Sequence, residues 1–366
     1  MTLTTYCNKI KSLPENNPLS QIISRKSLDN NFAWYKKKNL SSHFNNIIWQ
    51  ISWNWPEIIK NLRQHLLKGQ YQFSPLTRFE TKSSKVSCWT GLDVIVLKTL
   101  QTGLNNYLKD KIDLSSASHL KGNGRLKGAV RKAKNFSFKN IYVFKTDTAD
   151  FYKSIDHHVL DEQLCKLISD KRILRLLRQY CNRVDIQDGK HILIEARGIP
   201  KGGSLSPLLG ALYLYPVDAY AKKYKLDYVR YMDDIVFFTK TKKKLRKIIK
   251  IIKTIHEITK KIGLKLAKNK TYIGELSKGF DFLGYRIFPQ EIHIAKTSYQ
   301  RMIEKLYRHY VQQASSDRLR QYLKRWLQWT KASVGSVFES IQIYTKPHPS
   351  RKIQIKQSIG GLIVSV

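Results

Sequence analysis

Residues 228–238 read Tyr228-Val-Arg-Tyr-Met-Asp-Asp-Ile-Val-Phe-Phe238 and place two adjacent carboxylates, Asp233 and Asp234, between two runs of β-branched and aromatic residues. Such runs form strands, and a turn of two or three residues between them makes a β-hairpin. Carboxylates side by side at the tip repel each other, and a hard divalent cation with oxygen ligands relieves that repulsion. Because Asp is also common in ordinary turns, this stretch alone leaves a metal site and a plain polar turn open.

Length and charge restrict the kind of protein further. The chain has 366 residues, 42% of them hydrophobic, which is enough for a sizeable core divided over two or three subdomains. Lysine and arginine total 66 against 27 aspartates and glutamates, a formal net charge of +39. An AT-rich genome would also favour lysine codons, but the abundance of arginine and aromatic residues favours nucleic acid as the partner.

The cysteines and the apolar segments exclude several classes. The four cysteines (Cys7, Cys88, Cys165 and Cys181) contain no C-x-x-C pair, so neither a zinc ribbon nor a zinc endonuclease module is expected. They indicate reduced, mostly buried thiols. No signal peptide and no run of membrane-spanning length is present in the sequence. We therefore expect a cytoplasmic protein without a membrane partner.

Apolar spacing predicts the secondary structure along the chain. Residues 1 to about 50 are polar and weakly patterned, which indicates an irregular arm with a short helix near its end. Asp93 and Asp156 are each expected to open a helix. Extended segments are predicted over residues 71–80 and 141–147. Helices are predicted over residues 53–67, 93–108, 157–167, 208–224 and 242–262, and again after residue 297.

Two glycine-rich loops are candidate phosphate sites. Residues 119–131 (HLKGNGRLKGAVR) combine three glycines with four basic residues just before a helix. Backbone N–H groups at such a turn suit phosphate, although the spacing is not that of a P-loop and a solvated basic loop is equally compatible. Residues 197–207 (RGIPKGGSLSP) also precede a helix, and their glycines let the backbone approach a ligand closely.

The order of these pieces resembles a reverse transcriptase, most of all the bacterial group II intron type. The resemblance covers residues 140–290 and rests on five elements in order: Asp147 with Tyr152, residues 198–207, residues 231–234, residues 263–271 and residues 280–285. It implies an α+β right-hand polymerase fold, with fingers, a palm built on an antiparallel sheet and a helical thumb. The expected divisions are an N-terminal arm and helix over 1–70, fingers and palm over 71–290, and a thumb-like region over 291–366.

The same resemblance implies an RNA-directed DNA polymerase, a nucleotidyltransferase that adds dNTPs to a DNA or RNA primer on an RNA template by two-metal-ion phosphoryl transfer. The implied catalytic and metal-binding residues are Asp147, Asp233 and Asp234, which would hold Mg²⁺ or alternatively Mn²⁺, with Lys270 as proton donor to the pyrophosphate. The implied nucleotide contacts are Tyr152, Lys201, Gly202, Ser206, Pro207 and Tyr231, where Tyr152 excludes ribonucleotides. The implied nucleic-acid contacts are Lys121, Arg125, Lys127, Phe282, Leu283, Gly284 and Tyr285.

The chain also departs from the family. Lys201 stands where the family usually has Gln, and the Arg-Pro-Leu of the fingers strands is missing, which leaves Arg78, Lys82 or Lys85 as candidates to bind triphosphate. Two alternatives to the polymerase remain: a maturase-like RNA-binding protein, and a defence-type enzyme that makes DNA without a template. The presence of all three carboxylates favours an enzyme. The oligomeric state stays open.

Overall fold

The computed structural model describes residues 17–81, 84–194, 196–240, 253–334, 341–344, 354–357 and 363–365. Within these ranges the fold is α+β, and all strand pairs but one are antiparallel, as predicted. The expectations for residues 1–16, for the start of the helix over 242–262, and for the side chains of Arg78, Lys82 and Lys85 lie outside the described part.

A four-stranded antiparallel sheet forms the centre of the molecule, with the order β6-β7-β3-β8. Its strands are β3 (Tyr142–Thr146), β6 (Asp227–Tyr231), β7 (Asp234–Thr239) and β8 (Tyr272–Glu275). The hairpin predicted around residues 228–238 is confirmed, with Met232 and Asp233 as its turn. Successive side chains point to opposite faces: Phe144 and Phe237 join one apolar cluster, whereas Val143 and Val236 join another. The sheet therefore needs cover on both faces.

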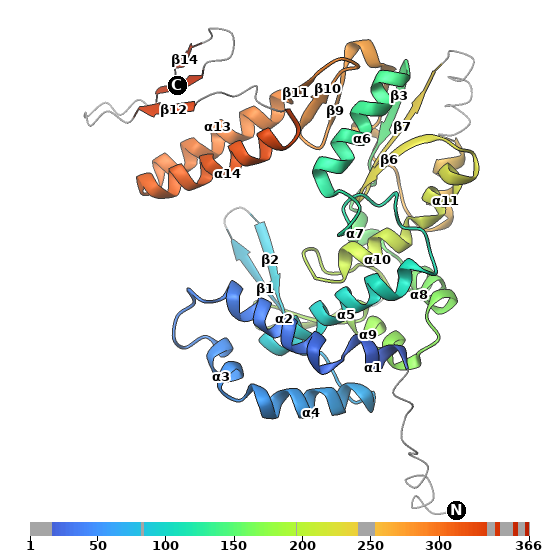
Figure 1. Cartoon of the computed structure of the whole chain (residues 1–366), viewed down its shortest axis with the longest axis vertical. Helices are drawn as coiled ribbons and strands as arrows, with labels where there is room; N and C mark the ends of the chain where they lie inside the picture. Colours follow the sequence, from blue (N-terminus) through green and yellow to red (C-terminus); the bar gives the residue numbers. More distant parts are fainter. Residues whose placement is uncertain are drawn as a thin grey trace, which may run out of the picture.

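Helices supply that cover. Helix α6 (Arg125–Lys139) packs on β6 and β7 from one side, and the helices α7 (Phe151–Ser154), α8 (His157–Leu167), α10 (Ser206–Tyr213) and α11 (Tyr215–Lys223) lie on the other (Figure 1). The single helix predicted over residues 208–224 is wrong, because it breaks at Leu214. Pro216 has no N–H to continue the hydrogen-bond ladder of α10, and it fits instead the first turn of a new helix.

The N-terminal region is more ordered than its sequence indicated. From residue 18 it forms α1 (Pro18–Ile22), α2 (Arg25–Lys38), α3 (Ile47–Trp53) and α4 (Trp55–Leu67). The first three pack with α5 (Gly91–Lys109), and α4 packs on α2 and α3. The irregular arm predicted up to residue 50 is therefore wrong in this part. A few fully buried anchors hold these polar helices, among them Leu19, Leu28 and Ile48. These anchors are too sparse to show a clear helical period.

A mixed sheet joins this helical region to the rest of the chain. It has the order β2-β1-β4-β5, with β1 (Leu76–Thr81), β2 (Ser84–Cys88), β4 (Val184–Gln187) and β5 (Lys190–Leu193), and helix α9 (Lys171–Cys181) precedes β4. Asp93 does not cap α5, whose N-cap is Thr90. The buried Asp93 carboxylate instead accepts hydrogen bonds from the Tyr71 hydroxyl (2.6 Å), the Ser74 amide (3.1 Å) and Thr90 (2.7 Å). Asp93 thus connects helix α5 to residues 71–74, which precede β1.

The C-terminal part combines strands and helices. A meander of β9 (Phe280–Phe282), β10 (Tyr285–Ile287) and β11 (Ile292–Ile294) leads into α13 (Lys296–Val311) and α14 (Ser316–Val334), which lie side by side (Figure 1). The two predicted helices are confirmed. The region is not purely helical, however, because β12 (Ile341–Tyr344), β13 (Gln354–Gln357) and β14 (Ile363–Ser365) form a further antiparallel sheet.

Two sequence expectations concern the surface. Among the described cysteines, Cys88 and Cys165 are exposed and Cys181 alone is buried, so the prediction of mostly buried thiols is wrong, although all three are free of disulfides. None of the helices in the described ranges has the length and hydrophobicity to cross a bilayer.

Candidate active site

Three carboxylates meet at one end of the central sheet. Asp147 follows directly after β3, Asp233 lies in the β6–β7 turn, and Asp234 is the first residue of β7. The register pairs Thr146 of β3 with Ile235 of β7, which brings the ends of these two strands together. The structure therefore places side by side the three residues that the sequence singled out as catalytic and metal-binding.

The turn that carries Asp233 has a left-handed residue, Met232, with φ of 55°. Such a backbone is costly for a residue other than glycine. The Met232 amide donates a hydrogen bond to Nδ1 of His119 (3.0 Å), and its carbonyl accepts one from Nη1 of Arg230 (3.0 Å). Both polar groups of the strained peptide are therefore fixed by side chains, which holds the turn in place.

His119 and Arg230 are themselves anchored. Nε2 of His119 donates to the carbonyl of Pro207 (3.0 Å), and burial lowers the pKa of this histidine to about 4, so it is the neutral imidazole. Arg230 is fully buried and donates through Nε to Asp218 (2.8 Å) and through Nη2 to the second oxygen of the same carboxylate. The sequence analysis missed both roles: a histidine beside a glycine-rich loop and an arginine in a strand have many ordinary uses.

The carboxylate cluster carries unfavourable charge. Burial, and then the neighbouring Asp147 carboxylate, raise the pKa of Asp233 to about 7. Burial also raises the pKa of Asp234, although Lys145, at 3.7 Å, acts in the opposite direction. Lys270 forms an ion pair with Oδ2 of Asp147. These two lysines supply part of the positive charge that the cluster needs.

The donor set fits a divalent cation. Oδ1 of Asp147 is buried without a hydrogen-bond partner. Like the other side-chain oxygens of the cluster, it is a carboxylate oxygen, the ligand preferred by hard cations. In the described ranges no three acidic, histidine or cysteine side chains yet converge into a complete ligand set. Lys270 pairs with Oδ2 of Asp147, so Oδ1 is the oxygen through which this residue would hold a cation.

A cavity of about 680 Å³ opens beside the cluster. Of the residues predicted to bind nucleotide or to act on it, Tyr152, Lys201, Asp233 and Lys270 line this cavity. Burial raises the pKa of Tyr152 to about 12, so its hydroxyl is neutral, and it lies 3.8 Å from the sulfur of Met232. The cavity thus joins a tyrosine, a cation and the carboxylates in one space.

The other predicted nucleotide contacts lie elsewhere. Ser206 is buried below the loop, where its hydroxyl bonds to Tyr180 (2.7 Å) and donates to the carbonyl of Pro200 (2.5 Å). Pro207 faces His119, and the Tyr231 ring lies edge-on to the same imidazole at 5.9 Å. Gly202, with φ of 87°, forms the turn next to Lys201. Ser206 and Pro207 therefore support the loop and do not line the cavity.

Part of the predicted nucleic-acid surface is core. Phe282 and Tyr285 are fully buried, and the Tyr285 ring stacks on Trp329 with 4.6 Å between centroids. Phe282 lies on β9 and Tyr285 on β10, and both side chains pack in the apolar cluster that α6 also joins, so they cannot reach a nucleic acid. Leu283 and Gly284 form the turn between the two strands, both with positive φ. Three of the four cations in the glycine-rich segment were predicted to contact nucleic acid: Lys121 precedes α6, and Arg125 and Lys127 lie in its first turn.

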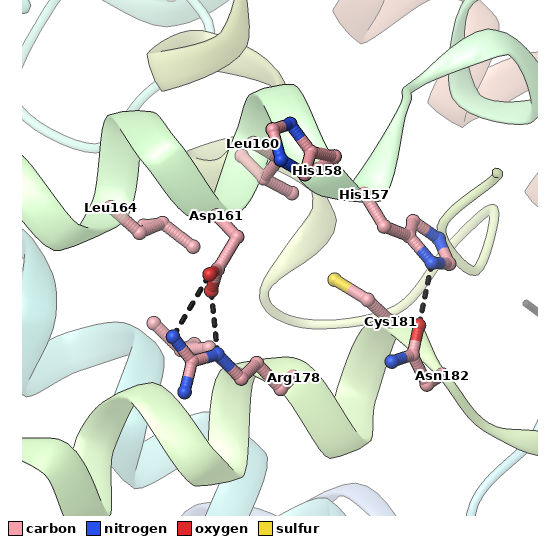
Figure 2. A pocket seen from close by; sticks show the side chains of 9 residues that line it. His157, His158, Leu160, Asp161, Leu164, Arg178, Cys181 and Asn182 are labelled. Atoms are coloured by element: carbon pink, nitrogen blue, oxygen red, sulfur yellow. Dashed lines mark hydrogen bonds and ion pairs between the residues drawn. The ribbon is translucent and has the colours of Figure 1, made fainter. Parts of the chain in front are cut away.

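A second pocket of about 210 Å³ lies between α8 and α9 (Figure 2). The His157 ring bridges Asn182 (2.6 Å) and the carbonyl of Gly198 (2.9 Å), and Asp161 pairs with Arg178 (2.7 Å). Burial raises the pKa of Cys181 to about 12, which leaves its thiol unreactive. The polar groups of this pocket hold one another and the Gly198 loop, so the pocket braces the wall of the larger cavity.

A sheet end with clustered carboxylates, next to a cavity with a lysine and a tyrosine, defines a nucleotidyltransferase of the polymerase class. Residues 58–287 match the sequence model of the family described as reverse transcriptase (RNA-dependent DNA polymerase). The chain therefore belongs to the reverse transcriptase family, and its α+β fold is the right hand expected of that family.

Two individual proteins were also found to be similar. Protein YkfC of Escherichia coli (strain K12) is 26% identical over 180 residues, which are 40% of this chain and 46% of that protein. The chain thus matches about half the length of this curated relative. An apo telomerase from Candida tropicalis, truncated from its C-terminal domain, aligns with a TM-score of 0.48 and 16% identity, over 66% of this chain and 60% of that one.

Proposed function

We propose that the chain is an active RNA-directed DNA polymerase. The observation that supports this most directly is the meeting of Asp147, Asp233 and Asp234 at the edge of the cavity that Tyr152 and Lys201 line. Its substrates are an RNA template, a DNA or RNA primer and dNTPs. The oxygen at the 3′ end of the primer attacks the α-phosphorus of the dNTP, a P–O bond forms, and the bond to pyrophosphate breaks.

Each side chain of the site has a defined part in this reaction. Asp147, Asp233 and Asp234 would hold two divalent ions, Mg²⁺ or alternatively Mn²⁺, which stabilise the charge on the attacking and leaving oxygens. Tyr152 lies where it can pack against the sugar, and Lys201 can contact the base pair or its phosphates. Lys270, which pairs with Asp147 and lines the cavity, would give a proton to pyrophosphate.

Finer features are part of the same proposal. We assign the chain to the group II intron-like branch, on the strength of the loop over residues 198–207 and the order of its motifs. The divisions would be an N-terminal region (1–70), whose described part holds α1 to α4, fingers and palm (71–290) and a thumb-like region (291–366). The cell compartment would be the cytoplasm of a prokaryote, where template RNA and dNTPs are both available.

Primer extension on poly(rA)/oligo(dT) with Mg²⁺ tests the activity. Wild-type protein should extend the primer, whereas Asp147→Asn and Asp233→Asn should lose about a thousandfold or more in rate, because each removes a ligand from the two-metal site. Asp188→Asn is the matched control, since Asp188 is exposed in the turn between β4 and β5. Full extension by either site variant would contradict the assignment.

Two other outcomes correspond to the alternatives. RNA binding without extension under any metal condition would favour a maturase-like RNA-binding protein, for which the net charge of +39 is suited. Incorporation that is equal with and without an RNA template would favour a template-independent DNA polymerase. Asp233→Asn should abolish incorporation in both polymerase cases and leave RNA affinity unchanged, so it separates the binding role from the catalytic one.

A further inference from the structure

A tryptophan on the N-terminal helix α2 is placed between two lysines. The Trp34 ring is 39% exposed; Nζ of Lys38 lies 5.5 Å from its centroid, and Nζ of Lys98 lies 5.3 Å from it. Lys38 belongs to the same helix, whereas Lys98 comes from α5, on which α2 packs. The ring is thus held at the surface where two elements meet, with cations at its face.

Further cations gather at the same place. Lys98 donates a hydrogen bond to Gln101 (2.9 Å), and burial together with repulsion from Lys121, Arg125 and Lys38 lowers its pKa. The four cations come from α2, α5 and the glycine-rich segment that opens α6. Within the described ranges none of them has an ion-pair partner. Gathering like charges costs folding energy, which an anionic ligand would offset.

This cluster borders the active site. Arg125 is the first residue of α6, which packs on β6, and Tyr231, the last residue of β6, lies edge-on to the His119 ring at 5.9 Å. The same glycine-rich segment contains His119, which holds the Met232 turn. A strand of nucleic acid leaving the site could therefore run over Arg125 and Lys121 to Lys98 and Trp34.

We propose that Trp34, Lys38, Lys98, Lys121 and Arg125 form a binding surface for the unpaired part of the template strand. A base stacks on the Trp34 ring, and the lysine that leaves the ring face moves to a phosphate. The inference rests on the proposed polymerase function for the identity of the strand. Trp34 and Lys38 lie before residue 58, where the match to the family begins, so they add a surface to the family's site.

Binding of primer–template with different single-stranded 5′ overhangs tests the surface. Labelled RNA–DNA duplexes with overhangs of 2 and 12 nucleotides are titrated by fluorescence anisotropy without dNTPs. Trp34→Leu should weaken binding of the long overhang about fivefold or more and leave the short one unchanged, as expected for the loss of one stacked base. Lys38→Gln and Lys98→Gln should each lower the salt dependence of long-overhang binding by about 0.7 in log–log slope.

The structure offers matched controls. Trp53→Leu removes a tryptophan that is 87% exposed on α3, and Lys37→Gln removes an exposed charge from α2 itself. Neither should distinguish the two overhangs. Equal effects of Trp34→Leu and Trp53→Leu, or equal effects on both overhangs, would overturn the proposal. Thermal melting verifies that each variant is folded.

The same titrations separate this proposal from the polymerase assignment. If wild type fails to extend a primer but Trp34→Leu still loses long-overhang affinity, the surface is supported and the polymerase function falls. If wild type extends the primer normally and Trp34→Leu binds the long overhang like wild type, the polymerase function stands and the proposed surface is overturned. Loss of binding to phosphatidylserine vesicles by Trp34→Leu, with RNA binding intact, would show that the surface serves a membrane and would overturn the proposal.

Discussion

His119 and Met232 are 113 residues apart in the sequence, but the Met232 amide donates a hydrogen bond of 3.0 Å to Nδ1 of His119. The other ring nitrogen donates to Pro207 at 3.0 Å. One imidazole therefore joins the glycine-rich segment, the loop before α10 and the turn that carries Asp233. The position of a metal-binding carboxylate thus depends on a residue that touches neither metal nor substrate.

Removing these two hydrogen bonds should slow catalysis. His119→Phe keeps a ring against Tyr231 but leaves the Met232 amide without its acceptor, a loss of about 1–3 kcal/mol, or roughly five- to 150-fold if it acts in the transition state. We expect the decrease mainly in kcat for primer extension, with little change in the KM for dNTP. His119→Asn, which can still accept from the amide, should recover part of the rate. Equal kcat for wild type and His119→Phe would contradict the positioning role.

The buried pair of Arg230 and Asp218 should contribute to stability as a unit. Arg230→Met leaves a buried carboxylate without its partner and should lower the free energy of unfolding by about 3–5 kcal/mol. The double variant Arg230→Met/Asp218→Leu should cost less than the sum of the single variants, because no charge then stays unpaired. Urea denaturation measures both. Primer extension by the double variant should remain slower than that of wild type, because the Met232 carbonyl has lost its hydrogen-bond donor. If the losses of unfolding free energy of the two single variants simply add in the double variant, the pair is not coupled.

Stability without metal should fall as the pH rises through the range of Asp233. Its pKa is raised from 3.8 to about 7 in the folded protein, so folding favours the protonated form. This contribution is full below about pH 4 and is lost as the pH approaches 7. Divalent metal should restore stability at pH 7.5 far more than at pH 5.

Thermal melting at several pH values, with Mg²⁺ and with chelator, measures this effect. In chelator, the melting temperature of Asp233→Asn should depend less on pH than that of wild type. Asp188→Asn should retain the wild-type profile, because Asp188 is exposed. An equal effect of Mg²⁺ on the melting temperature at both pH values would show that the ion does not bind at this cluster.

Tyr152 should act as the gate against ribonucleotides. Both Tyr152 and the neighbouring Phe151 border the cavity, but Phe151 is a buried core residue, as predicted, whereas Tyr152 is only partly buried and its hydroxyl lies against Met232. Tyr152→Val should admit rNTPs while dNTP incorporation survives at a lower rate. Phe151→Val should instead destabilise the fold by about 1–3 kcal/mol without changing sugar choice. Competition between labelled rNTP and dNTP decides; an unchanged ratio for Tyr152→Val would place the gate elsewhere.

Sequence alone was enough for features that depend on local pattern. The hairpin around Asp233, the strand before Asp147, the helix opened by Asp156 and the pair of C-terminal helices follow from apolar spacing and capping, which act over a few residues. The order of motifs along the chain predicted the family in the same way, because each motif is continuous in the sequence. The three carboxylates could be chosen on these grounds before any distance was known.

Only the tertiary structure decided which side chains face the site. Ser206 and Tyr285 lie in strong motifs but are buried, whereas His119, Lys145 and Trp34 had no individual signal and gain their surroundings from elements far away in the chain. Periodicity states which residues share a face of a helix or strand, but not what packs against that face. Contacts over a hundred residues depend on how sheets and helices are stacked, and that information is distributed over the whole core.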